Sequence, residues 1–462
     1  MTKLSTLVLA LAAACGNSAS LSHEQPDAGL RGSGSGSDSG SGSDSGSDSG
    51  SGSDVGSDTG SGSGSAISCA PQQFDHCDGS DAVSCNAAGD GFDDKACAFG
   101  CSDAHGCNAC EPSTESCVGN SLQTCSADGE PASSVACEAT CESSGTPHCE
   151  HIVPRYVPAS CDGFATKSLT VTGALAIDTD AAGTCTAVVS QAGGPDICVM
   201  RETSVVVTAG ASITVTGSRV LAIVSDDDLS IHGALDASAH GVTAGPGGGF
   251  TLSGGVPSTT QGGGGAGFQT AGGRGGGLSS NGGAATGDPA SGTIITGGPS
   301  ADAGGTGGAG GGAVILASCQ GTVKIDGTLN SGGGGGDAGA FGGGAGGYIV
   351  LEGVDVVVTG DVFANGGGGG AGLIKTGSDA TASLTRAPGG VAQLGGGGGG
   401  EGAIVGTNGA DGTNATQSGK RPGGGGGGIG WFQAYVPAGK IADLQPAVAS
   451  PGFQPTRAIT LE

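Results

Sequence analysis

Five carboxylates are the residues of this 462-residue chain best suited to bind a ligand, and they lie just before two similar apolar runs. They are Asp226, Asp227, Asp228, Glu352 and Asp355. Hard oxygen ligands of this kind suit calcium. If the two runs stack in a folded protein, the carboxylates lie at one edge, so a calcium site is one interpretation. A solvated polar turn that binds nothing is the alternative.

Cysteines are the other reactive side chains, and Cys107 and Cys110 have the spacing of a redox or zinc pair. They also mark the end of one cysteine set and the start of another, and four of six positions recur at one offset. This predicts two structural repeats in residues 66–150. The two sets are Cys69, Cys77, Cys85, Cys97, Cys101 and Cys107, then Cys110, Cys117, Cys125, Cys137, Cys141 and Cys149.

Disulfides are predicted to hold these repeats together, because each repeat has few large apolar residues. Each disulfide typically contributes about 2–4 kcal/mol. Six cysteines allow about 15 connectivities, so the pairing stays open. Farther along, Cys185 and Cys198 are near neighbours that can close a local loop, and Cys319 has Cys161 as its one obvious partner. Together with the two sets of six, these four cysteines make sixteen. An even number, which allows every cysteine to pair, fits an oxidising compartment.

The remaining sequence motifs do not indicate a catalytic site. Gly-x-Gly-x-x-Gly strings are frequent because glycine is frequent, and none follows a predicted strand and opens a helix, so we expect no dinucleotide site. His232 precedes a bend glycine and is expected to be a solvated side chain. The sequence offers no catalytic constellation, so we do not expect an enzyme.

A short repeat organises residues 151–462. Its pattern is apolar, any, apolar, any, Gly, any, apolar, and its four copies begin at Leu169, Leu229, Val323 and Val356. Period-two alternation places the apolar residues on one face of a strand, and the glycine permits a bend. Such units bury their apolar face only by stacking. We therefore predict a mainly β fold, a Gly-rich parallel β-helix or solenoid.

Equal spacing fixes a predicted register between two coils, because Leu229 to Val323 is the same distance along the chain as Val220 to Val314. Long runs of the chain's 104 glycines interrupt the coils. Ordering glycine costs more backbone entropy than ordering other residues. The runs are therefore either mobile corner loops or glycine-only helices that pack against one another.

The first 65 residues contain no predicted fold. Residues 1–15 have one lysine before an apolar run too short to span a bilayer, which predicts a secretory signal. The run ends in Ala12-Ala13-Ala14-Cys15, which resembles a bacterial lipobox, although Leu11 lies one place farther out than usual. The resemblance implies that Cys15 is lipidated, and a plain cleaved signal is the alternative. Residues 16–65, rich in Gly, Ser and Asp, are predicted to be a disordered linker.

The net charge of −27 argues against nucleic acid as a partner. The lipobox, the linker, the six-cysteine repeats and the Gly-rich strands together resemble exported lipoproteins of myxobacterial type. The Gly-rich part is similar in composition to PE-PGRS proteins, and the strand-Gly-strand units resemble haemagglutinin-type β-helices.

These resemblances imply an exported protein that a lipid anchors to the outer membrane at the cell surface, or alternatively a secreted one. We expect a structural or adhesive protein that binds cells, matrix or extracellular polysaccharide. A lyase or hydrolase built on a β-helix and acting on polysaccharide is the alternative. No cofactor is expected apart from possible calcium.

Overall fold

The computed structural model describes residues 68–277, 281–286, 288–302 and 306–462. These residues form thirty strands and two short 3-10 helices, η1 (Pro158–Cys161) and η2 (Pro289–Ser291), so the prediction of a mainly β fold is confirmed. The predicted signal and linker, with Cys15, lie outside the described residues.

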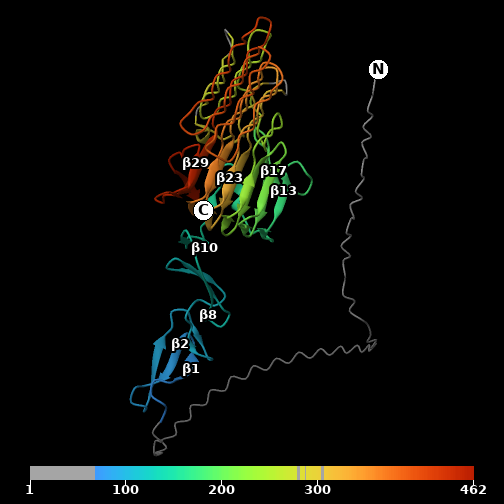
Figure 1. The fold of residues 1–462 in the computed structure, drawn as a ribbon. Helices are drawn as coiled ribbons and strands as arrows, with labels where there is room; N and C mark the ends of the chain where they lie inside the picture. The colour runs from blue at the N-terminus through green and yellow to red at the C-terminus, as the bar shows by residue number, and fades with distance from the viewer. Residues whose placement is uncertain (1–67, 278–280, 287, 303–305) are drawn as a thin grey trace, which may run out of the picture. The chain divides into compact units, whose positions relative to one another are not determined.

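Two small antiparallel units make up residues 68–150 (Figure 1). Each has one three-stranded sheet and one two-stranded pair, and side chains there are mostly exposed or half-buried. The first unit contains β1 (Phe74–Asp78), β2 (Asp81–Cys85), β3 (Phe92–Ala96), β4 (Cys101–Ser102) and β5 (Gly106–Cys107). The second contains β6 (Glu115–Val118), β7 (Ser121–Cys125), β8 (Pro131–Ala136), β9 (Cys141–Glu142) and β10 (His148–Cys149).

The two units share one disulfide connectivity: first cysteine to third, second to fifth, and fourth to sixth. The pairs are Cys69–Cys85, Cys77–Cys101 and Cys97–Cys107, then Cys110–Cys125, Cys117–Cys141 and Cys137–Cys149. Cys107 and Cys110 therefore belong to different disulfides and join two repeats. Outside the repeats, the pairs are Cys161–Cys319 and Cys185–Cys198.

Three sheets, which we call the strand stack, follow the disulfide repeats. The first is parallel and contains β12 (Leu169–Val171), β16 (Val205–Val207), β19 (Leu229–Ile231), β22 (Thr322–Ile325), β25 (Asp355–Val358) and β28 (Asp443–Leu444). The second is parallel and contains β13 (Ala174–Asp178), β17 (Ser212–Thr216), β20 (Ala234–Asp236), β23 (Thr328–Asn330), β26 (Asp361–Phe363) and β29 (Val448–Ser450).

The third sheet has eight strands and is parallel except at its two ends. Its order is β11 (Ile152–Val153), β30 (Arg457–Leu461), β27 (Trp431–Pro437), β24 (Tyr348–Glu352), β21 (Ala313–Ser318), β18 (Val220–Ser225), β15 (Ile197–Glu202) and β14 (Ala187–Val189). Five successive strand triplets, from β15–β17 to β27–β29, each give one strand to each sheet. Three copies of the sequence repeat correspond to the last two strands of a triplet, and the first copy, at Leu169, lies on β12 and β13.

Apolar side chains hold the strand stack together. Alternate residues of the short strands point inward and form one buried cluster that includes Ile213, Leu229, Val323 and Leu316. The middle strands of the third sheet are buried on both faces, because a second apolar cluster covers their outer side. This explains why β18 and β21 read as continuous apolar runs rather than as alternating ones.

The predicted register is right for one strand pair and wrong for the other. Leu229 pairs with Val323, as the equal spacing requires. Val314, however, pairs with Leu221 rather than with Val220. The corner between β21 and β22 therefore contains one more residue than the corner between β18 and β19. A corner can absorb an added residue that a paired strand cannot, since a slip would turn the buried face outward.

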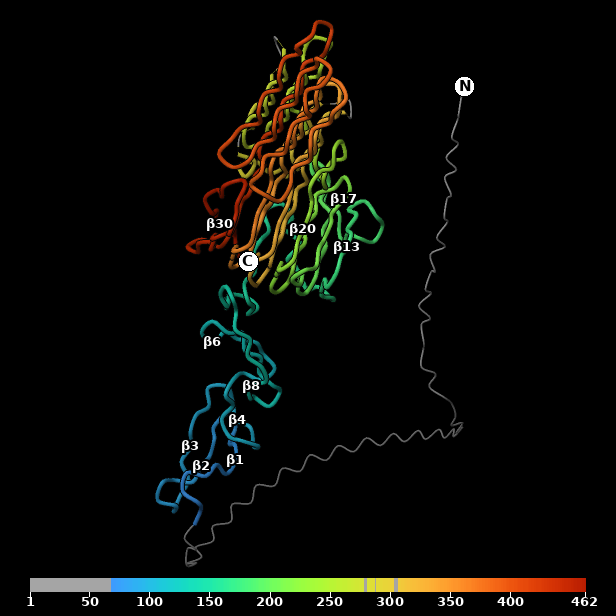
Figure 2. Tube along the Cα trace, in the orientation of Figure 1, coloured from blue at the N-terminus to red at the C-terminus, as the bar shows by residue number. Residues whose placement is uncertain are grey.

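All three Gly-rich insertions leave the strand stack at the same place, after the third strand of a triplet. They span residues 237–312, 331–347 and 364–430, and we call their described parts the glycine bundle. Figure 2 shows these segments, yellow to orange-red, running away from the strands to loops at their far end. The bundle is thus one structure assembled from three separate stretches of chain.

Backbone hydrogen bonds between neighbouring segments hold the glycine bundle. Residues three apart donate to the same neighbour: Gly424 and Gly427 to Gly370 and Gly367, Gly425 and Gly428 to Gly263 and Ala266, Gly423 and Gly426 to Thr413 and Ala410. A period of three residues per turn is that of a polyproline II helix, which makes no hydrogen bonds within itself. Each segment is therefore bonded on several sides by other segments.

Glycine is required here because the backbones lie too close for a side chain. A Cβ added at Gly427 would overlap the carbonyl oxygen of Gly344, and one at Gly369 would overlap that of Gly424. Of the two arrangements that the sequence left open, the structure has the packed one. Loops such as 415–421 are confined to the ends of the segments.

Candidate functional site

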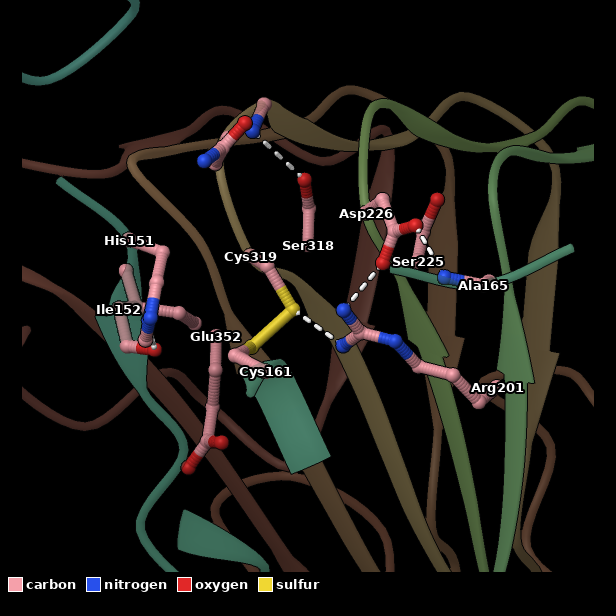
Figure 3. Close-up of a disulfide and its surroundings, with 12 residues drawn as sticks. His151, Ile152, Cys161, Ala165, Arg201, Ser225, Asp226, Ser318, Cys319 and Glu352 are labelled. Carbon is pink, nitrogen blue, oxygen red and sulfur yellow. Dashed lines mark hydrogen bonds and ion pairs between the residues drawn. A yellow bond between two sulfur atoms is a disulfide. The ribbon is translucent and has the colours of Figure 1, made fainter. Parts of the chain in front are cut away.

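The first aspartate of the acidic triplet, Asp226, lies beside a disulfide (Figure 3). Asp226 forms an ion pair with Arg201 and accepts a hydrogen bond from the Ala165 N–H at 2.6 Å. The same guanidinium donates to Sγ of Cys319 at 2.7 Å, next to the bond with Cys161. Burial lowers the pKa of Arg201, while the charge of Asp226 raises it. Asp226 therefore neutralises a buried cation.

The next two aspartates differ in their surroundings. Burial raises the pKa of Asp227, and the charges of Asp226 and Asp228 raise it further. Asp228 accepts a hydrogen bond from the Thr322 N–H at 2.8 Å, across to the following triplet. It thus helps to hold two successive corners together.

Glu352 is not at a corner, which corrects its predicted placing. It pairs with Ala317 inside the third sheet and is fully buried. Its two carboxylate oxygens accept from the Arg155 N–H at 3.2 and 3.3 Å. Burial raises the pKa of Glu352 to about 8, and Arg155 opposes this shift. Figure 3 shows Glu352 and Asp226 on opposite sides of the Cys161–Cys319 disulfide.

The fifth carboxylate, Asp355, pairs with Nζ of Lys440 at 3.2 Å, and both side chains are partly exposed. Among the residues that the structure describes, no three His, Cys, Asp or Glu side chains gather as metal ligands. The five predicted carboxylates therefore do not converge on one site. Asp226, Asp228, Glu352 and Asp355 each interact with a cation or a backbone donor of the protein itself, and calcium stays a prediction that this geometry does not favour.

His232, which we predicted to be a solvated side chain, has a defined partner. Its Nδ1 lies 2.6 Å from Oδ1 of Asp326, which occupies the same place in the following triplet. Both side chains are about one-third exposed. The pair joins neighbouring triplets at the surface.

A polar groove that we did not predict lies at the far end of the glycine bundle, where loops 257–261 and 415–421 meet. Its volume is about 440 Å³. Most side chains along it are hydroxyls, amides or an ammonium group, and Ala415 and Pro422 add apolar surface. The polar ones are Thr259, Thr260, Asn414, Gln417, Ser418 and Lys420. We call this the outer groove.

Hydrogen bonds to the backbone fix the loops around the outer groove. Asn414 accepts the Gly277 N–H at 2.7 Å, and Gly395 accepts the N–H groups of Thr416 and Gln417 at 3.0 and 3.2 Å. Arg421 donates to the Gly339 carbonyl at 3.4 Å. The only sequence signal for this site is that polar loops interrupt the glycine runs. Which loops meet depends on how the segments pack.

Within the described residues, no helix is long and apolar enough to cross a membrane. The arrangement thus consists of a strand stack, a glycine bundle and a polar groove at the end of that bundle. No known protein family, curated protein or solved structure matches the chain.

Proposed function

We propose that this chain is a cell-surface structural or adhesive protein that presents binding loops on a rigid support. In this proposal the strand stack is a β-solenoid, and the glycine bundle is a stalk that grows from one corner of it. The outer groove is the observation that carries the proposal, because it combines polar side chains with a backbone that many hydrogen bonds fix.

Preorganised loops favour binding because less conformational entropy is lost when a ligand orders them. The interior of the glycine bundle supplies this order without any side chains, since its segments bond directly to one another. Its core is packed backbone, so ligand contacts are restricted to its surface and its loops. A support of this kind suits a protein that holds on to a partner outside the cell.

Export and anchoring are part of the same proposal. All sixteen cysteines of the described residues form disulfides, which is typical of an oxidising compartment. A lipid on Cys15 and the Gly/Ser/Asp linker at 16–65 would tether the folded part to the outer membrane. Shaving intact cells with a protease that does not cross membranes should release the folded part. Protection until the outer membrane is broken would place the protein inside and remove the adhesive proposal.

A binding screen tests the function itself. The full chain, produced with its disulfides, should bind whole cells, extracellular matrix or purified polysaccharides without releasing sugar products. Binding to none of these surfaces would overturn the proposal. Saturable release of oligosaccharides would instead support a polysaccharide lyase or hydrolase.

A further inference from the structure

We propose that the outer groove binds acidic polysaccharide, with sugar hydroxyls against its hydroxyl and amide side chains and sugar carboxylates against Lys420 and its neighbours. This inference rests on the proposed function and names the ligand class of its binding loops. Three observations on the loops carry it: their charge, their side-chain chemistry and their fixed backbone.

The charge of these loops is opposite to that of the protein. Loops 257–261, 373–376, 393–396 and 415–421 contain three basic residues and no acidic residue, although the chain carries −27 overall. The adjoining loop 337–341 adds one carboxylate.

Most basic residues elsewhere in the described chain form ion pairs, and these are Lys167, Arg201, Arg219, Lys324, Arg386, Lys440 and Arg457. Within the described residues, Lys375, Lys420 and Arg421 have no carboxylate within ion-pair distance. Their charge is therefore available to a ligand.

The basic loops are adjacent in space. Gly372 donates to the Gly397 carbonyl at 2.9 Å, and Gly397 donates to that of Arg421 at 3.0 Å. The first contact brings loop 373–376 next to loop 393–396, and the second brings both next to loop 415–421. Screening in physiological salt reduces Coulomb interactions beyond about 8 Å. A bound anion therefore interacts most strongly with Lys420, which lines the groove, and with charges close to it.

The polar side chains of the outer groove can bind a sugar. Thr259, Thr260 and Ser418 offer hydroxyls, and Asn414 and Gln417 offer amides, which can both donate to and accept from sugar hydroxyl groups. A volume of about 440 Å³ lies within the range of small-ligand sites. Uronic acids combine the required groups, since each sugar carries several hydroxyls and one carboxylate.

Binding of the full chain to polygalacturonate, measured by affinity electrophoresis or calorimetry, tests the proposal, with dextran as the neutral polymer. We expect Lys420→Glu to weaken polygalacturonate binding at least tenfold. Added salt should weaken the wild-type complex, because the contact is partly ionic. Ser418→Ala, which removes one hydroxyl, should weaken binding about 3- to 10-fold.

Lys95→Glu is the matched control. Lys95 is exposed on β3 in the first disulfide repeat, and within the described residues it too has no carboxylate within ion-pair distance. The variant makes the same change in net charge away from the groove, so it should bind polygalacturonate like the wild type. Equal loss in both variants would show that overall charge decides binding, which would overturn the inference.

Two further outcomes separate this inference from the proposed function. If cells, matrix or dextran are bound but polygalacturonate is not, the ligand class is wrong and the adhesive function stands. If no surface is bound at all, both fail. Binding to anionic phospholipid vesicles should also be measured, because Ile374 and Leu394 expose apolar side chains on two of these loops. Vesicle binding without polysaccharide binding would overturn the inference in favour of a lipid surface.

Discussion

The strand stack and the glycine bundle are built next to each other from the same chain, and they solve the problem of burial in opposite ways. In the strand stack, Val, Ile and Leu side chains fill the space between three sheets. In the bundle, the buried material is the backbone itself, and neighbouring segments satisfy one another's N–H and carbonyl groups. One region depends on side chains being present and the other on their being absent.

This difference explains why the bundle needs the strand stack. Glycine segments gain little from the hydrophobic effect and lose much backbone entropy on ordering. Their ends, however, continue directly into strands that are already paired, such as β23, β24 and β26. Ala266 and Ala345 of the bundle pack in the same apolar cluster as Tyr348 and Trp431 of the strands. The strand stack therefore positions the segments, and hydrogen bonds join them.

A methyl group added inside the bundle should have the largest effect. Gly427→Ala places a Cβ on the Gly344 carbonyl, and overpacking of this kind should lower the free energy of unfolding by about 3 kcal/mol or more. Denaturation followed by the fluorescence of Trp431, the chain's single tryptophan, measures this.

Gly173→Ala is the control for that variant. A Cβ at Gly173 has no neighbour within 4 Å, so the same methyl group should change stability by no more than about 0.5 kcal/mol. If the two variants were equally stable, the bundle would not be as closely packed as the structure has it.

Removing a side chain from the strand stack is the opposite change. Leu316 is fully buried between the sheets, so Leu316→Ala should cost about 2–5 kcal/mol through lost burial and the cavity left behind. The same denaturation experiment reports it. An unchanged transition would mean that side-chain burial does not hold this region, and the contrast with the bundle would fail.

The dependence of stability on pH is a further test of the strand stack, because this region contains a buried carboxyl group. The pKa of Glu352 is raised from 4.5 to about 8. At a pH between these two values, the folded protein keeps a proton on Glu352 that the unfolded chain has lost. Stability should therefore fall as the pH rises through this window, by at most about 1.4 kcal/mol per pH unit. Melting temperatures of the wild type between pH 5 and 8 should decline. Those of Glu352→Gln should be flatter, and parallel curves would contradict the assignment to Glu352.

Surface charge should matter least. Lys440 and Asp355 are both partly exposed, so Lys440→Ala should cost less than about 1 kcal/mol, and added salt should reduce even that. A larger loss, measured by denaturation at low and high salt, would mean that this pair fixes the corner of the strand stack.

Local pattern was enough to predict the repeating strands. Apolar residues alternate around a glycine at Leu229 and Val323, and because strand geometry is local, this periodicity identifies the buried face. The cysteine offsets likewise predicted two units with disulfides. The connectivity stayed open, because which sulfur atoms meet depends on the path of the chain between them.

The candidate carboxylates show where local pattern fails. Glu352 and Asp226 each precede the next strand by only a few residues, yet one is inside a sheet and the other at a corner. The corners differ in length, and one residue more or less moves a side chain to the other face. Arg155 and Arg201, which interact with these carboxylates, are separated from them in sequence and could not be assigned in advance.

The sequence by itself determined the local geometry of this protein: alternating strands, bends at glycine and segments without side chains. Only the tertiary structure decided that the glycine runs pack rather than move, because each run needs acceptors from segments far along the chain. It also decided that polar loops meet in one groove at the end of the bundle. Hydrogen bonds between distant backbones leave no periodic trace in a sequence, whereas the burial of side chains does.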